Sequence, residues 1–166
     1  MCHQQHLDVL RRGVSYWNAW RTRRKRFDLS GADLSGCDLR GICFSDGNIE
    51  GVSLRDANLE GANLDRANMF GASLVEADLM WGNLSGAVLE FADLSGADLQ
   101  MADLSDVCCD RACFAGAGVN QMFVKGASMC GAFFRDLKGH PIGVDEEQHS
   151  SITANCSARR QVWTEC

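Results

Sequence analysis

The sequence predicts an all-β fold, a quadrilateral β-solenoid preceded by an α-helical cap. Three observations support this prediction: a five-residue period over residues 27–136, an apolar residue at the centre of every unit, and an amphipathic stripe before the repeat. A period of five fits neither the 3.6-residue turn of a helix nor the alternation of a long strand. The internal repeat therefore decides the fold.

The 22 units share one plan, which is small, polar, large, variable and turn. The central residue is Leu in 13 units, Ala stands two places earlier in 14, Asp or Asn directly precedes the centre in 12, and Gly closes 11. Four units make a square coil with one short extended segment on each side. At a strand spacing of ~4.8 Å, about five and a half stacked coils give a rod on the order of 26 Å long.

The central residues form four columns when the sequence is read at intervals of twenty. The columns on the first to fourth sides of the coil begin at Leu29, Leu34, Leu39 and Phe44, in that order. We expect the columns to point inward and the residue before each centre to point outward. Ala recurs beside the columns because a narrow axis leaves little room. A Leu in place of Ala62 or Ala97 should overpack the interior, at a typical cost of about 1–3 kcal/mol or more.

The A-[DN]-L-x-G units resemble the pentapeptide-repeat protein family over about two thirds of the chain. The resemblance implies a right-handed coil. The family includes small-molecule resistance proteins that imitate DNA and bind DNA gyrase, and also many members without an assigned activity. Residues 13–21 resemble the leader that precedes the first unit in small bacterial members, which implies a bacterial source.

Residues 1–26 are predicted to form the N-terminal cap. Leu7, Leu10, Val14 and Trp17 recur at spacings of three and four, so one amphipathic helix to about residue 25 would cover the first coil. The basic cluster from Arg21 to Arg26 has two interpretations. It is either a patch that binds nucleic acid or another anionic surface, or a set of solvated cations. Cations are favoured at the C-terminal end of a helix, where the helix dipole is negative.

Charge is distributed unevenly, with +6 in residues 1–26, −11 in residues 27–136 and −1 in residues 137–166. No apolar run approaches the ~20 residues of a membrane span, and the first segment lacks the apolar region of a secretory signal. Nine irregularly spaced cysteines beside a large core indicate reduced thiols rather than a disulfide framework. We therefore expect one cytoplasmic domain.

Apolar side chains at the corners are the first candidate partner-binding surface. They form two groups, one beside the first side of the coil and one beside the third: Phe70, Val88 and Phe91, and Met80, Trp81 and Met101. Grouped apolar residues on a surface indicate a contact site, and Trp is favoured at binding hot spots.

Carboxylates form the second candidate surface. Asp38, Asp78 and Asp98 are expected in one column on the third side, and Asp93 on the second. Regularly spaced carboxylates resemble the phosphates of a duplex, which lie one per ~1.7 Å of axis. Alternatively, Asp and Asn occupy this position because their short side chains bond to nearby backbone in tight turns.

The outward position changes character near the C-terminal end, where it holds Cys108, Cys113, Gly118, Phe123, Ser128 and Phe133. Outward Phe side chains imply a cover. The candidate is residues 137–166, which would form a C-terminal cap, a homodimer interface of the kind that the gyrase-binding relatives imply, or a partly disordered tail.

No catalytic, cofactor or metal site is predicted. Cys108, Cys109, Cys113 and Cys130 lack paired C-x-x-C spacing, and Cys109 is expected to point inward. The four histidines lie outside the repeat and have no regular relation to a nucleophile. The glycines mark corners rather than a phosphate loop, and a filled rod offers no cleft.

The sequence favours a non-enzymatic interaction or scaffold module with an unidentified protein partner, without membrane contact and without direct nucleic-acid binding through the rod. The alternative is a DNA mimic that binds gyrase or another topoisomerase. A ~26 Å rod is shorter than one ~34 Å turn of B-DNA, so mimicry requires a homodimer. Reversing Asp78, Asp93 and Asp98 to Lys would then remove inhibition, and salt would weaken it.

Overall fold

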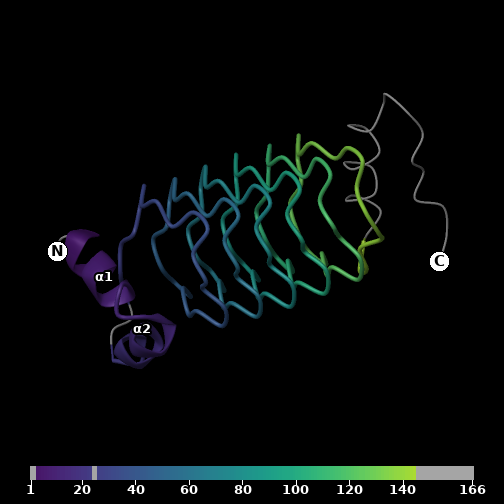
Figure 1. The fold of residues 1–166 in the computed structure, drawn as a ribbon. Helices are drawn as coiled ribbons and strands as arrows, with labels where there is room; N and C mark the ends of the chain where they lie inside the picture. The colour runs from purple at the N-terminus through teal and green to yellow at the C-terminus, as the bar shows by residue number, and fades with distance from the viewer. Residues whose placement is uncertain (1–2, 24–25, 145–166) are drawn as a thin grey trace.

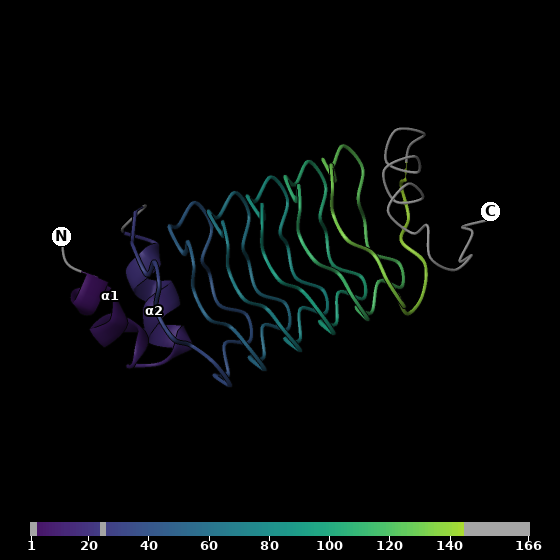
Figure 2. The same ribbon diagram turned by 90° about the horizontal axis from the view of Figure 1, so that it is seen from above.

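A computed structural model describes residues 3–23 and 26–144. These residues form a rod of stacked coils with two helices at its N-terminal end (Figure 1). Seen from above, the coils lie side by side along the axis of the rod, and the helices lie against its first coil (Figure 2). The cap, dimer interface or tail expected over residues 137–166 falls outside the described residues from position 145 onward.

Short parallel pairings join the coils. The described residues contain 20 isolated parallel β-bridges, from Asp28 with Asn48 to Phe123 with Ile142, and no longer strand. The partner lies twenty residues further along the chain in every bridge except the last. Within one such pairing, the Leu29 N–H donates to the Asn48 carbonyl oxygen at 2.8 Å. Pairing continues beyond residue 136, which extends the solenoid past the last predicted unit.

The interior confirms the predicted columns. The central residue of every unit is buried, and the largest exposed fraction among them is 6%, at Leu34. Cys109 is fully buried, as the columns predict. Ala62 and Ala97 are also buried beside the columns. Backbone hydrogen bonds between coils and a buried apolar axis therefore hold the rod together.

Each corner is a tight turn that ends in a left-handed backbone conformation. In the first unit, the Ala32 N–H donates to the Leu29 carbonyl oxygen at 3.0 Å, and Gly31 between them has a φ of 65°. The closing residue has a positive φ in all 22 units, eleven of them glycine. This conformation costs an L-residue about 1–2 kcal/mol, and glycine avoids that cost.

The outward Asp and Asn side chains bond to their own corners. In each of the twelve units that carry one, the side-chain Oδ1 accepts the backbone N–H two residues later. These residues are Asp28, Asp33, Asp38, Asn48, Asn58, Asn63, Asn68, Asp78, Asn83, Asp93, Asp98 and Asp103. Turn formation therefore explains why short acceptor side chains fill this position.

The N-terminal cap contains two helices, α1 (His3–Leu10) and α2 (Val14–Arg21). The expectation of one continuous helix was wrong, because Gly13 at the junction adopts a φ of 99°, outside the helical range. The predicted apolar stripe nevertheless packs on the first coil. Leu10 and Trp17 are buried in the core, and Leu7 and Val14 are partly buried against it.

Side chains of the cap replace a missing coil at the edge of the rod. The Asp28 N–H donates to His6 Nδ1 at 3.1 Å, and the Cys43 N–H donates to Asn18 Oδ1 at 2.8 Å. The Trp17 indole N–H donates to the Cys43 carbonyl oxygen at 2.8 Å. The break at Gly13 lets α1 and α2 reach two different sides of the coil, where exposed strand edges would otherwise invite association.

Arg21 differs from the solvated cluster expected at the end of α2. Its side chain is buried, donates to the Ser45 carbonyl oxygen at 2.5 Å, and lies over the Phe27 ring at 4.7 Å. Arg23 and Arg26 are exposed. Arg24 and Lys25 lie outside the described residues, so the role of the remaining cluster stays a prediction.

Neither helix of the described chain is long and apolar enough to cross a membrane. The cysteines in the described part of the chain are all free, and they are Cys37, Cys43, Cys108, Cys109, Cys113 and Cys130.

Candidate interaction surface at two corners of the rod

Three large apolar residues occupy the left-handed closing position, where glycine is the easiest residue to accommodate. Trp81 (φ 56°), Phe91 (φ 60°) and Met101 (φ 58°) are 53%, 51% and 44% exposed. The other non-glycine residues at this position are charged or amide side chains: Asp46, Asp56, Arg66, Glu76, Asp106, Arg111, Gln121 and Asp136. A bulky residue with positive φ is uncommon, and such strain concentrates at functional sites.

The first cluster, which we call the Phe corner, consists of Phe70, Phe91 and Arg111. The ring centres of Phe70 and Phe91 lie 5.4 Å apart, and Phe70 is 39% exposed. The Arg111 guanidinium carbon lies 5.3 Å from the centre of the Phe91 ring, a cation–π contact between adjacent coils. Val88, predicted to join this group, is half-buried in the ladder between Asn68 and Cys108.

The second cluster, the Trp corner, consists of Met80, Trp81 and Met101. The Trp81 indole N–H donates to Met101 Sδ at 2.9 Å, so the two side chains lie against each other across adjacent coils. Met80 is half-buried. The Phe corner follows the first side of the coil and the Trp corner follows the third, so the two clusters lie at opposite corners of the square.

The candidate acidic surface is less regular than the sequence suggests. Asp78 and Asp98 are bridged neighbours, but the outward positions on either side of them hold Asn58 and Gly118. Asp98 Oδ1 accepts the Gln100 backbone N–H at 3.0 Å, and its Oδ2 accepts the Gln100 side-chain N–H at 3.1 Å. The carboxylates are therefore engaged in their own turns.

The remaining acidic candidates are engaged in the same way. Asp93 Oδ1 accepts both the backbone N–H and the hydroxyl of Ser95. Asp38 forms an ion pair with Arg40 at 2.7 Å, and hydrogen bonds from that arginine lower the pKa of the carboxyl below its usual value. A neighbouring cation thus offsets part of the charge that a phosphate mimic would need.

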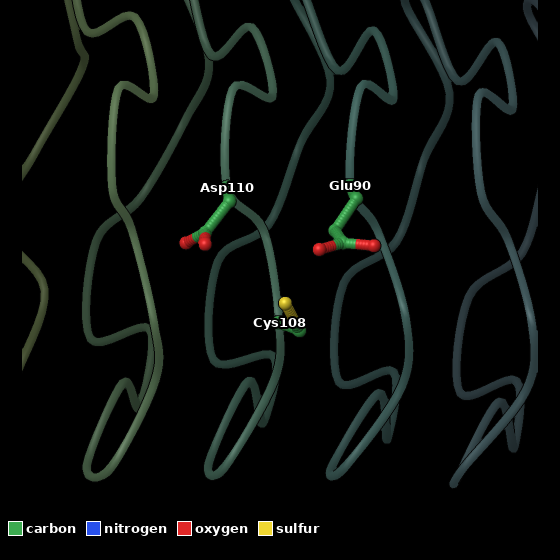
Figure 3. Close-up of side chains that lie close together, drawn as sticks. All are labelled: Glu90, Cys108 and Asp110. Carbon is green, nitrogen blue, oxygen red and sulfur yellow. The ribbon is translucent and has the colours of Figure 1, made fainter.

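Sequence reasoning missed one cluster of potential metal ligands. Glu90, Cys108 and Asp110 place one ligand atom each within 4.8 Å of one another (Figure 3). Asp110 Oδ1 already accepts the Ser128 hydroxyl at 2.6 Å and the Cys130 N–H at 2.8 Å. Burial raises the pKa of the Cys108 thiol, which favours the protonated form and makes it a poorer ligand.

Two open hollows lie on the surface of the described residues. A hollow of about 470 Å³ lies where the cap meets the first coil, and its lining includes His6, Trp20 and Phe27. A second, of about 310 Å³, lies beside Asp98, where Gly118 leaves a gap in the outward column. Both hollows are open to solvent.

The sequence signal for the corner clusters was present but incomplete. Six apolar corner residues were predicted, and the structure places Phe70 with Phe91 and Trp81 with Met101. The role of Arg111 and the left-handed conformation were missed. Glycine closes eleven of the units, and that frequency could have identified the position as one that disfavours large side chains.

Comparison with known proteins agrees with this architecture. The family model for pentapeptide repeats matches eight copies in residues 25–46, 48–86 and 83–117, more than half of the chain. The chain belongs to the pentapeptide-repeat family. Membership confirms the right-handed quadrilateral β-solenoid that the repeat predicts.

Solved pentapeptide-repeat structures resemble the chain. Rfr23 from the cyanobacterium Cyanothece 51142 is 22% identical, with a TM-score of 0.51, over 74% of this chain and 93% of Rfr23. HetL, involved in heterocyst differentiation regulation in Nostoc, is 28% identical, with a TM-score of 0.48. That match covers 68% of this chain and 63% of HetL, so it spans less than two thirds of HetL.

A plasmid-mediated fluoroquinolone resistance protein, QnrB1, is 17% identical, with a TM-score of 0.25, over 78% of this chain and 71% of QnrB1. No curated protein matches the chain. The comparisons therefore establish the family and the fold and leave the partner to be inferred from this chain's own surface.

Proposed function

We propose that this pentapeptide-repeat protein is a non-enzymatic interaction module that binds a protein partner through its corner clusters. The observation that carries the proposal is the presence of Trp81, Phe91 and Met101 in a left-handed conformation, each about half exposed. Glycine at the same position would fold more easily and would be more soluble. Large apolar side chains kept there at a local cost are expected to serve a contact.

The neighbouring coils show that the fold does not need these side chains. Gly61 occupies the column of Trp81 one coil earlier, and Gly71 occupies the column of Phe91. Both glycines have nothing within 4 Å of the place where a Cβ would stand, so the corner is open there. Trp81→Gly and Phe91→Gly thus copy corners that the protein already builds.

The test is cross-linking followed by direct binding. A photoreactive residue at position 91 or 81 should cross-link a specific cellular protein, which is then purified. We expect Trp81→Gly together with Phe91→Gly to abolish binding of that partner, whereas Gln121→Gly should leave it unchanged. Gln121 is the matched control because it lies in the Trp81 column with a φ of 57° and outside both clusters. Unchanged affinity in the double variant would reject the proposal.

DNA mimicry remains a separate prediction, favoured by the adjacent carboxylates of Asp78 and Asp98. It predicts salt-sensitive inhibition of gyrase supercoiling that the reversal of Asp78, Asp93 and Asp98 to Lys removes. Inhibition that survives both high salt and charge reversal would contradict mimicry. Loss of inhibition in Trp81→Gly with the carboxylates intact would instead assign the effect to the corner surface.

A further inference from the structure

We infer that the Trp corner binds an arginine- or lysine-bearing segment of the protein partner, with the partner's cation over the Trp81 indole. This inference rests on the proposed interaction function and specifies the chemistry of the partner at one of the two clusters. It follows from a difference between the two corners, which are built alike but are electrostatically unlike.

At the Phe corner, the aromatic ring already has a cation. Phe91 closes its unit, and Arg111 closes the stacked unit in the next coil, with its guanidinium carbon 5.3 Å from the ring centre. The protein therefore shows how a cation sits on an aromatic residue at this position. Stacking at intervals of twenty makes that geometry repeatable at any corner.

At the Trp corner, the equivalent place holds Met101 instead of a cation. Within the described residues, three cation–π contacts are present, and none involves Trp81. The indole is 53% exposed, and its N–H donates to Met101 Sδ, so one edge of the ring rests on Met101. Trp is the aromatic residue that binds cations best. The ring is thus positioned and open.

The surroundings of the Trp corner are acidic. Along the chain, the charged residues within three positions of Trp81 and Met101 are Asp78, Asp98 and Asp103, all carboxylates. One cation, Lys138, lines the hollow beside Asp98. Asp78 and Asp98 lie side by side in adjacent coils. An arginine or lysine over the indole would therefore meet an aromatic face, with the carboxylates of Asp78 and Asp98 three positions before Trp81 and Met101 in the chain. Both features favour cations over neutral or anionic groups.

A matched pair of peptides tests the inference. Acetyl-(Gly-Arg)₄-amide is compared with the same peptide in which citrulline replaces arginine, since citrulline keeps the planar shape and loses the charge. Affinities of the wild type and of every variant are measured by isothermal titration calorimetry. In the wild type, the shift of the Trp81 indole N–H resonance, assigned by its absence in Trp81→Phe, reports contact at the indole. We expect the arginine peptide to bind the wild type about 5- to 30-fold more tightly than Trp81→Gly, and Trp81→Phe to recover part of that affinity.

Two further variants separate the aromatic contribution from general charge. Asp98→Asn keeps the turn hydrogen bond, as Asn58 and Asn83 do, and should weaken binding by about 2- to 5-fold. Gln121→Gly, which lies in the Trp81 column but outside both clusters, should leave peptide binding unchanged. Equal affinity for the arginine and citrulline peptides, or equal affinity in wild type and Trp81→Gly, would overturn the inference.

The proposed interaction function can survive that failure. If the cross-linked partner loses affinity for Trp81→Gly while the two peptides bind equally, the Trp corner is an interaction site for an apolar segment. The inference about the cation would then be wrong.

Discussion

The coils before and after residue 107 share one interior but differ in their outer surface. In the early coils the outward position holds Asp or Asn in most units, with a hydrogen bond to the turn, as in Asp78. In the late coils it holds residues such as Phe123 and Phe133, which are 47% and 45% exposed. The ladder runs through both regions unbroken. The buried columns are therefore sufficient for the coil, and the outer surface is free to vary with function.

Truncating an interior side chain should have the largest effect. Leu99→Ala removes a fully buried central residue and leaves a cavity, so we expect a loss of about 2–5 kcal/mol in the free energy of unfolding. Asp98→Asn, at the adjacent outward position, should change it by less than ~0.5 kcal/mol, since the amide keeps the turn bond. Denaturant unfolding measures both. Similar losses of stability in the two variants would contradict the conclusion that the buried columns, and not the outward residues, determine the fold.

Removing a cap contact should have the next largest effect. Asn18 accepts the Cys43 N–H and donates to the Gly41 carbonyl oxygen at 2.9 Å. Asn18→Ala leaves both groups unpaired, and we expect a loss of about 1–3 kcal/mol and faster hydrogen exchange at the Cys43 amide. Asn18→Asp, which keeps the acceptor alone, should retain slow exchange at that amide. Unchanged exchange in Asn18→Ala would show that the cap does not protect this edge.

Thiol labelling compares the outer surface with the interior at two consecutive residues, Cys108 and Cys109. Cys109 points inward, and burial strongly raises the pKa of its thiol, so the thiolate is rare. Cys130 is exposed. With iodoacetamide at pH 8, peptide mapping should show Cys130 labelled first, Cys108 more slowly, and Cys109 only after unfolding. Early labelling of Cys109 in the folded protein would contradict the buried column.

A smaller effect is expected from acid. Hydrogen bonds from Ser35 lower the pKa of Asp33, and those from Arg40 lower the pKa of Asp38. A lowered pKa stabilises the fold above the pKa of the unfolded chain, near 4, and this contribution is lost as the pH falls through the lowered value. The denaturant midpoint of unfolding should therefore decrease when the pH is lowered below about 4. Asp38→Asn should make this pH dependence slightly weaker. A midpoint that rises on acidification would contradict the assignment.

The sequence predicted the repeat, the inward columns and the outward Asp and Asn because each depends on residues at a fixed spacing. It did not predict the break at Gly13 or the burial of Arg21, since both depend on how the cap meets one particular coil. The sequence did predict that apolar residues gather in two groups at the corners. The Arg111 contact on Phe91 was missed because it joins two variable positions in different coils.

The strained corners differ from the interior in how much of each large side chain is exposed to solvent. Trp81 and Phe91 are large, yet about half of each side chain is in solvent. Replacing them by glycine removes some packing and also removes the cost of a left-handed L-residue. These effects are of similar size, about 1–2 kcal/mol each, so they should nearly cancel.

The most direct test is the denaturant midpoint of the double variant Trp81→Gly, Phe91→Gly, measured beside Leu99→Ala and Gln121→Gly. We expect the free energy of unfolding of the double variant to stay within about 1 kcal/mol of the wild type, far from the loss in Leu99→Ala. That result would show that the fold does not depend on the corner side chains, as a role in binding requires. A loss as large as that of Leu99→Ala would assign them a structural role and contradict our account.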